Sequence, residues 1–176
     1  REKDPDNALL WRMPTRMLRM EAMRDSMLAA SGELKRTAGG RPFEENADRA
    51  IPRRTVYAFV NRDVISKLAS TFNGADPAAC TVKRPETMVP QQTLFALNSN
   101  FIQDRATALL KLPNIRQAES EEDRVRMIYR QIYSRAPDAG EVTEALAFLK
   151  QGDNPEKTRQ QFVHALLASN EFHFVD

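Results

Sequence analysis

The single cysteine, Cys80, is the first residue whose chemistry could matter, because a thiolate is a strong nucleophile. Lys83 and Arg84 follow it closely, and positive charge nearby would favour the thiolate. A nucleophile also needs a general base, and no histidine lies in this half of the sequence. His164 could reach Cys80 only through the fold. We therefore expect Cys80 to be a small buried thiol at the edge of a strand, with a catalytic thiol as the alternative.

The two histidines give little support for a metal site. His164 and His173 would lie on different sides of a continuous helix, so a shared metal would require a break between them. We expect both to be packing residues and predict no metal. The sequence also contains no GxGxxG, P-loop, GxSxG or HExxH motif.

A group of basic residues is a stronger candidate for binding. It comprises Arg53, Arg54, Lys83 and Arg84. If the segments that carry them pair as strands, four cations converge near the helix start predicted at Pro90, an arrangement suited to sulfate, carboxylate or phosphate. The alternative, which we favour, is that they form ion pairs with the acidic loop 44–48.

The first half of the chain predicts one helix, a long loop and a minor β element. Pro14 suits a first helical turn, and methionines then recur every three or four residues up to Gly32, a pattern typical of a core-facing helix. Residues 33–54 lack such a pattern and predict a long loop. "TVYAFV" (55–60) is rich in β-branched and aromatic residues and predicts a strand, with "ACTVKR" (79–84) as its partner.

The remainder predicts helices with recognisable starts. Pro90 opens one that has an irregularity at 98–100, Ser120 caps the next, Asp138 and Glu141 form a capping pair, and Asn154 precedes the last. We predict a mainly α fold: an irregular helical domain with a small two-stranded β element and a C-terminal antiparallel helical bundle. We expect one domain over 1–176, with sub-parts 1–112 and 118–176.

The amino-acid composition limits the classes of function that the chain can have. The 176 residues are 41% hydrophobic and 28% charged, as in a soluble globular chain. Lys and Arg outnumber Asp and Glu only by 26 to 24, and the two signs are interspersed, which argues against a nucleic-acid partner. No apolar run is long enough to span a bilayer. Because the chain begins with Arg1, we expect it to be an excised piece of a longer protein.

Several longer strings of the sequence are more informative than any single residue. They are "RRTVYAFVNRD", "RPETMVPQQTLFALNSNF", "RVRMIYRQIYSRAPDAGE" and "LLASNEFHFVD". Together they resemble the planctomycete-type PSD-one family, a domain of unknown function. The resemblance covers nearly the whole chain, from "DPDNALLWRMPTRMLRM" onward. It implies the C-terminal portion of a large secreted or surface protein, often preceded by a planctomycete-type cytochrome c domain and a second domain of unknown function.

The family resemblance offers no catalytic residues to carry over, so three functional hypotheses stay open. We favour a non-catalytic structural or interaction domain of a large extracytoplasmic bacterial protein, in contact with the preceding domains of the same chain. The alternatives are a module that binds an anionic carbohydrate, and part of a haem-associated oxidoreductase or polysaccharide-degrading enzyme. No cofactor is expected in this domain, with haem only in another domain of the parent. The favoured hypothesis predicts an exposed apolar patch near Trp11, Met13 and Met17.

Overall fold

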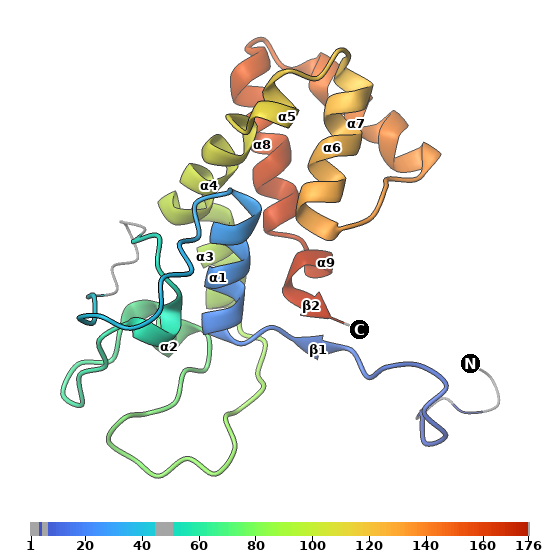
Figure 1. The fold of residues 1–176 in the computed structure, drawn as a ribbon. Coiled ribbons are helices and arrows are strands. Elements are labelled where there is room, and N and C mark those ends of the chain that lie inside the picture. Colours follow the sequence, from blue (N-terminus) through green and yellow to red (C-terminus); the bar gives the residue numbers. More distant parts are fainter. Residues whose placement is uncertain (1–3, 5–6, 45–50, 176) are drawn as a thin grey trace.

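A computed structural model describes residues 4, 7–44 and 51–175 and shows a mainly helical chain, as predicted (Figure 1). In chain order its elements are β1 (Arg16–Met17), α1 (Met20–Ala30), η1 (Thr55–Tyr57), α2 (Lys67–Thr71), α3 (Pro90–Asn98), α4 (Asn100–Leu110), α5 (Pro113–Arg116), α6 (Glu121–Tyr133), α7 (Ala139–Gln151), α8 (Pro155–Leu167), α9 (Asn170–His173) and β2 (Phe174–Val175). The element η1 is a single turn of 3₁₀ helix.

The core is built where α1, α4, α6 and α8 meet. Met23 and Met27 of α1 are completely or almost completely buried, so the methionine stripe is core, as its spacing predicts. Ile102 from α4 and Val163 from α8 are fully buried in the same cluster. Residues from both predicted sub-parts of the chain therefore share one hydrophobic core.

Capping residues in the sequence predict most of the observed helix starts correctly. The side chain of Ser120 accepts a hydrogen bond from the amide of Asp123, and Asp138 forms a capping box with Glu141. Asn154 caps α8 ahead of a proline in the first turn. The predicted irregularity in the helix after Pro90 is also present, because Ser99 has extended backbone angles and separates α3 from α4.

Gly32 ends α1 for two reasons. Its φ of +74° lies in the left-handed region, which glycine enters without the steric cost of a Cβ. A Cβ at this position would also lie 2.7 Å from Cδ2 of Leu112, a contact too close to accept without movement. The chain can therefore turn sharply after α1 and still pack against the loop that follows α4.

A small two-stranded β element is present, as predicted, but other residues form it. The prediction of strands at 55–60 and 79–84 is therefore wrong. The two-stranded antiparallel sheet joins the two ends of the described chain, with Arg16 opposite Val175 and Met17 opposite Phe174. Residues 55–57 instead form η1, because Asp25 binds both the amide and the hydroxyl of Thr55. Tertiary hydrogen bonds thus override the strand preference of this segment.

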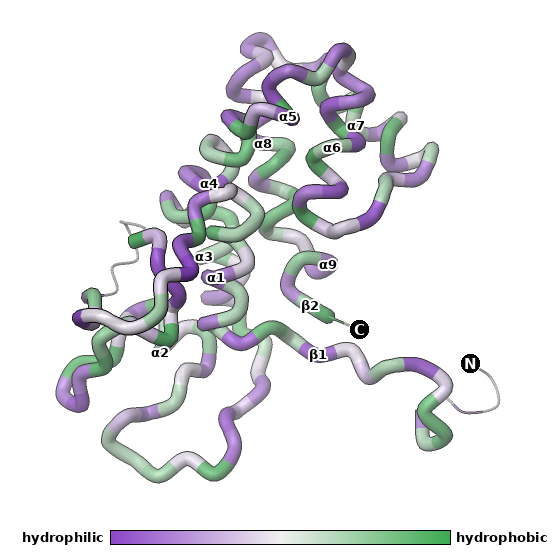
Figure 2. The backbone as a smooth tube through the Cα atoms, in the orientation of Figure 1, coloured by the Kyte–Doolittle hydropathy of each residue, from purple (hydrophilic) through white to green (hydrophobic). Residues whose placement is uncertain are grey.

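Residues 7–17 form an arm that leaves the body before α1 (Figure 1). The helix that Pro14 was predicted to start begins only at Met20, and the intervening residues run through β1. Figure 2 shows a hydrophobic stretch at the hooked end of the arm, away from the helices. This arm is attached to the body through β1, which pairs with β2.

Candidate functional site

Side chains of α1 organise the region in which the four basic residues were predicted to meet. Arg24 is 2% exposed, and its guanidinium donates to the carbonyl oxygens of Ile51 (2.8 Å) and Arg53 (3.0 Å) and to the hydroxyl of Thr55 (3.1 Å). Its neighbour Asp25 accepts from the amide and the hydroxyl of Thr55, at 2.7 and 2.6 Å. Together these contacts hold the end of the long loop against α1.

Arg54 and Arg84 lie against carboxylates one helical turn apart on α1. Arg54 approaches Asp25 at 3.5 Å, while Arg84 donates to Glu21 at 2.8 Å. Partial burial acts to raise the pKa of Glu21, but the hydrogen bond from Arg84 and the nearby positive charge outweigh it, so its pKa lies below the ordinary value. Glu21 is therefore ionised at neutral pH and neutralises Arg84.

Arg53 and Lys83 have different surroundings. The Arg53 guanidinium donates to the carbonyl oxygens of Gly39 and Arg41 and stacks over the ring of Tyr57, 4.8 Å from its centroid. Lys83 is exposed in the loop after α2, with Glu86 at 3.9 Å. The structure thus gives each of the four basic residues a partner within the chain, and anion binding by the four together stays a prediction. Residues 45–48 of the acidic loop, with which ion pairs were predicted, lie outside the described residues.

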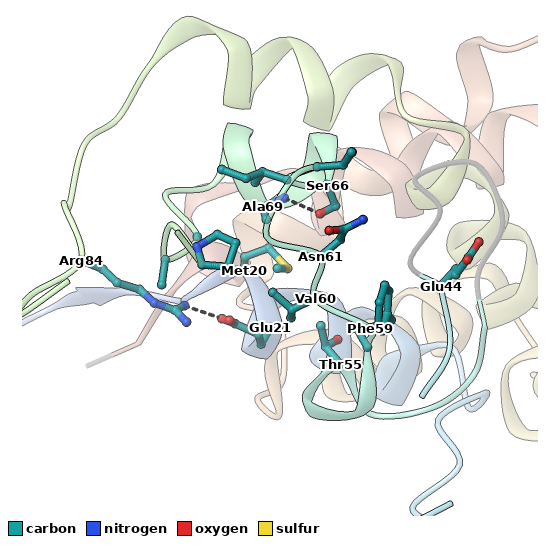
Figure 3. A pocket seen from close by; sticks show the side chains of 16 residues that line it. Met20, Glu21, Glu44, Thr55, Phe59, Val60, Asn61, Ser66, Ala69 and Arg84 are labelled. Atoms are coloured by element: carbon teal, nitrogen blue, oxygen red, sulfur yellow. Dashed lines mark hydrogen bonds and ion pairs between the residues drawn. The ribbon is translucent and has the colours of Figure 1, made fainter. Parts of the chain in front are cut away.

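A cleft of about 490 Å³ opens beside the Glu21–Arg84 ion pair (Figure 3). Its walls are mostly apolar and come from α1, η1, α2, the segment between η1 and α2 and the loop after α2, with Glu44 beside them. They include Met20, Phe59 and Val60. Figure 3 shows the ion pair on one side of the cleft and Glu44 on the opposite side. Such a cleft could accept an apolar group of a binding partner, with a polar group of that partner next to the ion pair.

Neither Cys80 nor His164, the two groups considered for catalysis, is among the described residues that line the cleft. None of the described residues that line it is a histidine or a cysteine. Cys80 is exposed in the loop between α2 and α3, so its interpretation as a buried thiol at a strand edge is wrong. The reason is that residues 79–84 form no strand and residues 79–83 are exposed, with Val82 99% exposed.

The histidines are packing residues at separate places, as predicted. Nε2 of His164 lies 2.7 Å from the carbonyl oxygen of Ala96, so this ring joins α8 to α3. His173 is buried in α9, and burial lowers its pKa below the ordinary value. No group of three or more potential metal ligands occurs among the residues that the structure describes.

Arg135 fixes the turn between α6 and α7. It makes paired hydrogen bonds to Glu141 (2.6 and 2.7 Å) and to Glu171 (2.6 and 2.8 Å) and lies over the rings of Tyr129 and Tyr133. The hydrogen bonds from Arg135 lower the pKa of Glu141 to about 2. Burial raises the pKa of Tyr133 to about 12. These contacts hold the turn between α6 and α7 in place.

Two buried arginines were not among the residues predicted to be functional. Arg24 and Arg105 are 2% and 5% exposed, and each faces a ring of Phe101. Arg105 also lies 2.7 Å from a carboxylate oxygen of Glu33. A weak signal exists for Arg24, because its position lies between Met20 and Met27 on the core-facing side of α1.

Fold and site together define a small helical domain with a mostly apolar cleft beside the Glu21–Arg84 ion pair. The chain belongs to the PSD1 family, described as "Protein of unknown function (DUF1553)", whose model matches residues 1–149. The family predicted from the sequence strings is therefore confirmed. Comparison with curated proteins and with solved structures gave no match.

The family match ends inside α7, whereas the folded unit continues. The α8 helix lies outside the matched residues, yet Val163 and Leu167 are fully buried and Phe162 is 8% exposed. Gln160 donates to the hydroxyl of Thr107, which ties α8 to α4. A fragment that stops at the family boundary would leave the core open on the α4 side.

No helix among the described residues has the length and apolar character required to cross a membrane.

Proposed function

We propose that this chain is a non-catalytic interaction domain of a larger, extracytoplasmic bacterial protein. Its contact surface is an apolar knob formed by residues 7–13, which packs against a preceding domain of the same protein. The resemblance to secreted and surface proteins supports the location, and one of their characteristic domains, a cytochrome c, is the kind of neighbour we expect. The exposed side chains of the knob are the observation that carries the proposal.

The knob exposes large apolar side chains that the body does not cover. Leu9, Leu10 and Met13 are 83%, 74% and 64% exposed, and Trp11 is 48% exposed. The expected apolar patch near Trp11 and Met13 is confirmed, although Met17 is half-buried against the core. Burial of a leucine or methionine side chain contributes roughly 1.5–3 kcal/mol, so covering this surface would provide substantial binding free energy.

Hydrogen bonds within the arm hold the knob in shape. The Asp4 carboxylate accepts from the amides of Ala8 and Leu9, both at 2.8 Å, and the Trp11 indole donates to the Asp4 carbonyl at 3.0 Å. Leu10 has a φ of +52°, in the left-handed region that a leucine enters only at a cost of roughly 1–2 kcal/mol. A preformed turn that accepts this strain and exposes its leucines is suited to recognition.

The position of the knob suits a partner in the same chain. A domain joined to the N-terminal side of the arm would be tethered directly beside residues 7–13. Such a tether gives a high effective concentration, so that a modest contact area is sufficient for stable docking.

Hydroxyl-radical footprinting tests the proposal on side chains directly. Oxidation of Trp11 and Met13 is compared between the 1–176 chain and the longer parent protein. We expect strong protection of both residues in the parent. Met88, which is 74% exposed on the loop before α3, is the control and should be oxidised equally in the two proteins. Equal oxidation of Trp11 and Met13 in both proteins would exclude the proposed contact.

A further inference from the structure

A second cavity, of about 660 Å³, lies between the end of α4, α5, α6 and the first turns of α8. Five basic residues line it: Lys111, Arg116, Arg124, Lys157 and Arg159. They come from four separate elements or helix ends, so the sequence does not show them as a cluster. Only the packing of α8 against α4 brings them together.

Two of the five basic residues already share a carboxylate partner. Arg124 and Arg159 both donate to the carboxylate of Glu121. Partial burial acts to raise the pKa of Glu121, but the two arginines outweigh it and lower the pKa below its ordinary value. Glu121 is therefore ionised at neutral pH and holds both guanidinium groups at the cavity wall.

The other three basic residues have no such partner. No ion pair or side-chain hydrogen bond is found for Lys111, Arg116 or Lys157 among residues 7–44 and 51–175. Glu156 also lines the cavity, which leaves five cations facing two carboxylates when Glu121 is included. Adjacent unpaired cations repel one another, and a bound anion would relieve that repulsion.

The walls of the cavity are held in place. Gln160 on α8 donates to the hydroxyl of Thr107 on α4 at 2.9 Å, and Nε of Arg124 donates to the Ile115 carbonyl at 3.2 Å. Asn154 accepts from two amides in the first turn of α8. Because those amides are occupied, the charge available to a ligand comes from the side chains.

We propose that this cavity binds the sulfate or phosphate ester group of a small ligand, with Lys111, Arg116 and Lys157 as its cationic contacts. A sulfate or phosphate ester offers three terminal oxygens as acceptors to these three side chains, and a guanidinium can bind two of them at once. A volume of 660 Å³ is within the range of small-molecule sites and has room for a sugar attached to the ester. The site is independent of the apolar knob.

Calorimetric titration with glucose 6-sulfate and glucose 6-phosphate, with glucose as the neutral reference, tests the site and separates its two ester classes. The Arg116→Gln/Lys157→Gln double variant removes two unpaired charges, and both side chains are exposed, so the fold should be unaffected. Lys83→Gln is the control, because Lys83 is equally exposed but lies in the loop after α2.

We expect saturable binding of at least one ester that weakens at least tenfold in the double variant and is unchanged in Lys83→Gln. Preference for one ester would identify the ligand class, and equal binding would show that the site recognises the shared oxyanion. Absence of saturable binding by both esters would overturn the proposal. So would glucose binding as tightly as its esters, or an equal loss of affinity in Lys83→Gln.

Discussion

Replacing Arg24 with methionine would remove a buried guanidinium while retaining an unbranched apolar side chain. The guanidinium serves the carbonyl oxygens of Ile51 and Arg53 and the hydroxyl of Thr55, and it lies 3.9 Å from the Asp25 carboxylate. In Arg24→Met these acceptors would lose their donor in a site where water has little access. We expect residues 51–53, at the end of the long loop, to loosen from α1.

The expected loss of stability depends on how many hydrogen bonds of this network remain after the substitution. Breaking a buried ionic network by removing one partner costs about 3–5 kcal/mol. Asp25 keeps the two hydrogen bonds from Thr55, so part of the network survives the substitution. We therefore expect the free energy of unfolding to fall by about 3 kcal/mol, at the lower end of that range.

Urea unfolding followed by far-ultraviolet circular dichroism measures this change. Arg126→Met is the matched control, because Arg126 on α6 makes an exposed pair with Glu122 whose loss should cost below about 0.5 kcal/mol. A loss of less than about 1 kcal/mol in Arg24→Met would refute the reasoning, since it is no more than an ordinary neutral hydrogen bond contributes.

Three further predictions concern other parts of the chain. The pKa of Glu141 is about 2 in the folded protein against an ordinary 4.5, so its contribution to stability is present above pH 4.5 and is lost as the pH falls towards 2. Glu141→Gln should therefore flatten the acid limb of stability measured by urea unfolding at several pH values. Gly152→Ala should destabilise the chain by about 1–3 kcal/mol in the same assay, because a Cβ there would lie 1.8 Å from Oγ1 of Thr158. Cys80 should react with a thiol reagent in the native protein about as fast as in the unfolded protein, because its side chain is exposed.

Each of these has a control within the chain or the assay. Glu144→Gln changes another carboxylate of α7 and should leave the acid limb unchanged. Gln151→Ala alters the exposed residue beside Gly152 and should have little effect. Thiol reactivity that appears only after unfolding would show that Cys80 is shielded in the native protein. An acid limb of stability that Glu141→Gln leaves unaltered would contradict the role of the Arg135 contact.

The parts of the fold that local chemistry determines were predictable. The caps at Ser120, Asp138 and Asn154 each depend on residues within four positions of one another, and the burial of Met23 and Met27 follows from helical spacing. Patterns of this kind are visible in a short window of sequence. The family, too, was recognisable from contiguous strings.

The parts that depend on distant contacts were not predictable. Met17 pairs with Phe174 across almost the whole chain, and no local signal in either strand identifies the other. Thr55 has a strand-forming side chain but is held by Asp25, thirty positions away. The basic cavity is the same case, because Lys111 and Lys157 become neighbours only when α8 packs on α4. Cys80 was assigned to a strand edge that does not form.

The pairing of β1 with β2 has a mechanical consequence. Arg16 lies opposite Val175, so the outermost residues of the two strands, those nearest the ends of the chain, form one pair. A force that pulls these two ends apart would load the hydrogen bonds one after another, as in opening a zipper, and not all together in shear. The two-residue sheet would then open at low force while the helical core remained intact, which would release the arm and its knob before any helix unfolds.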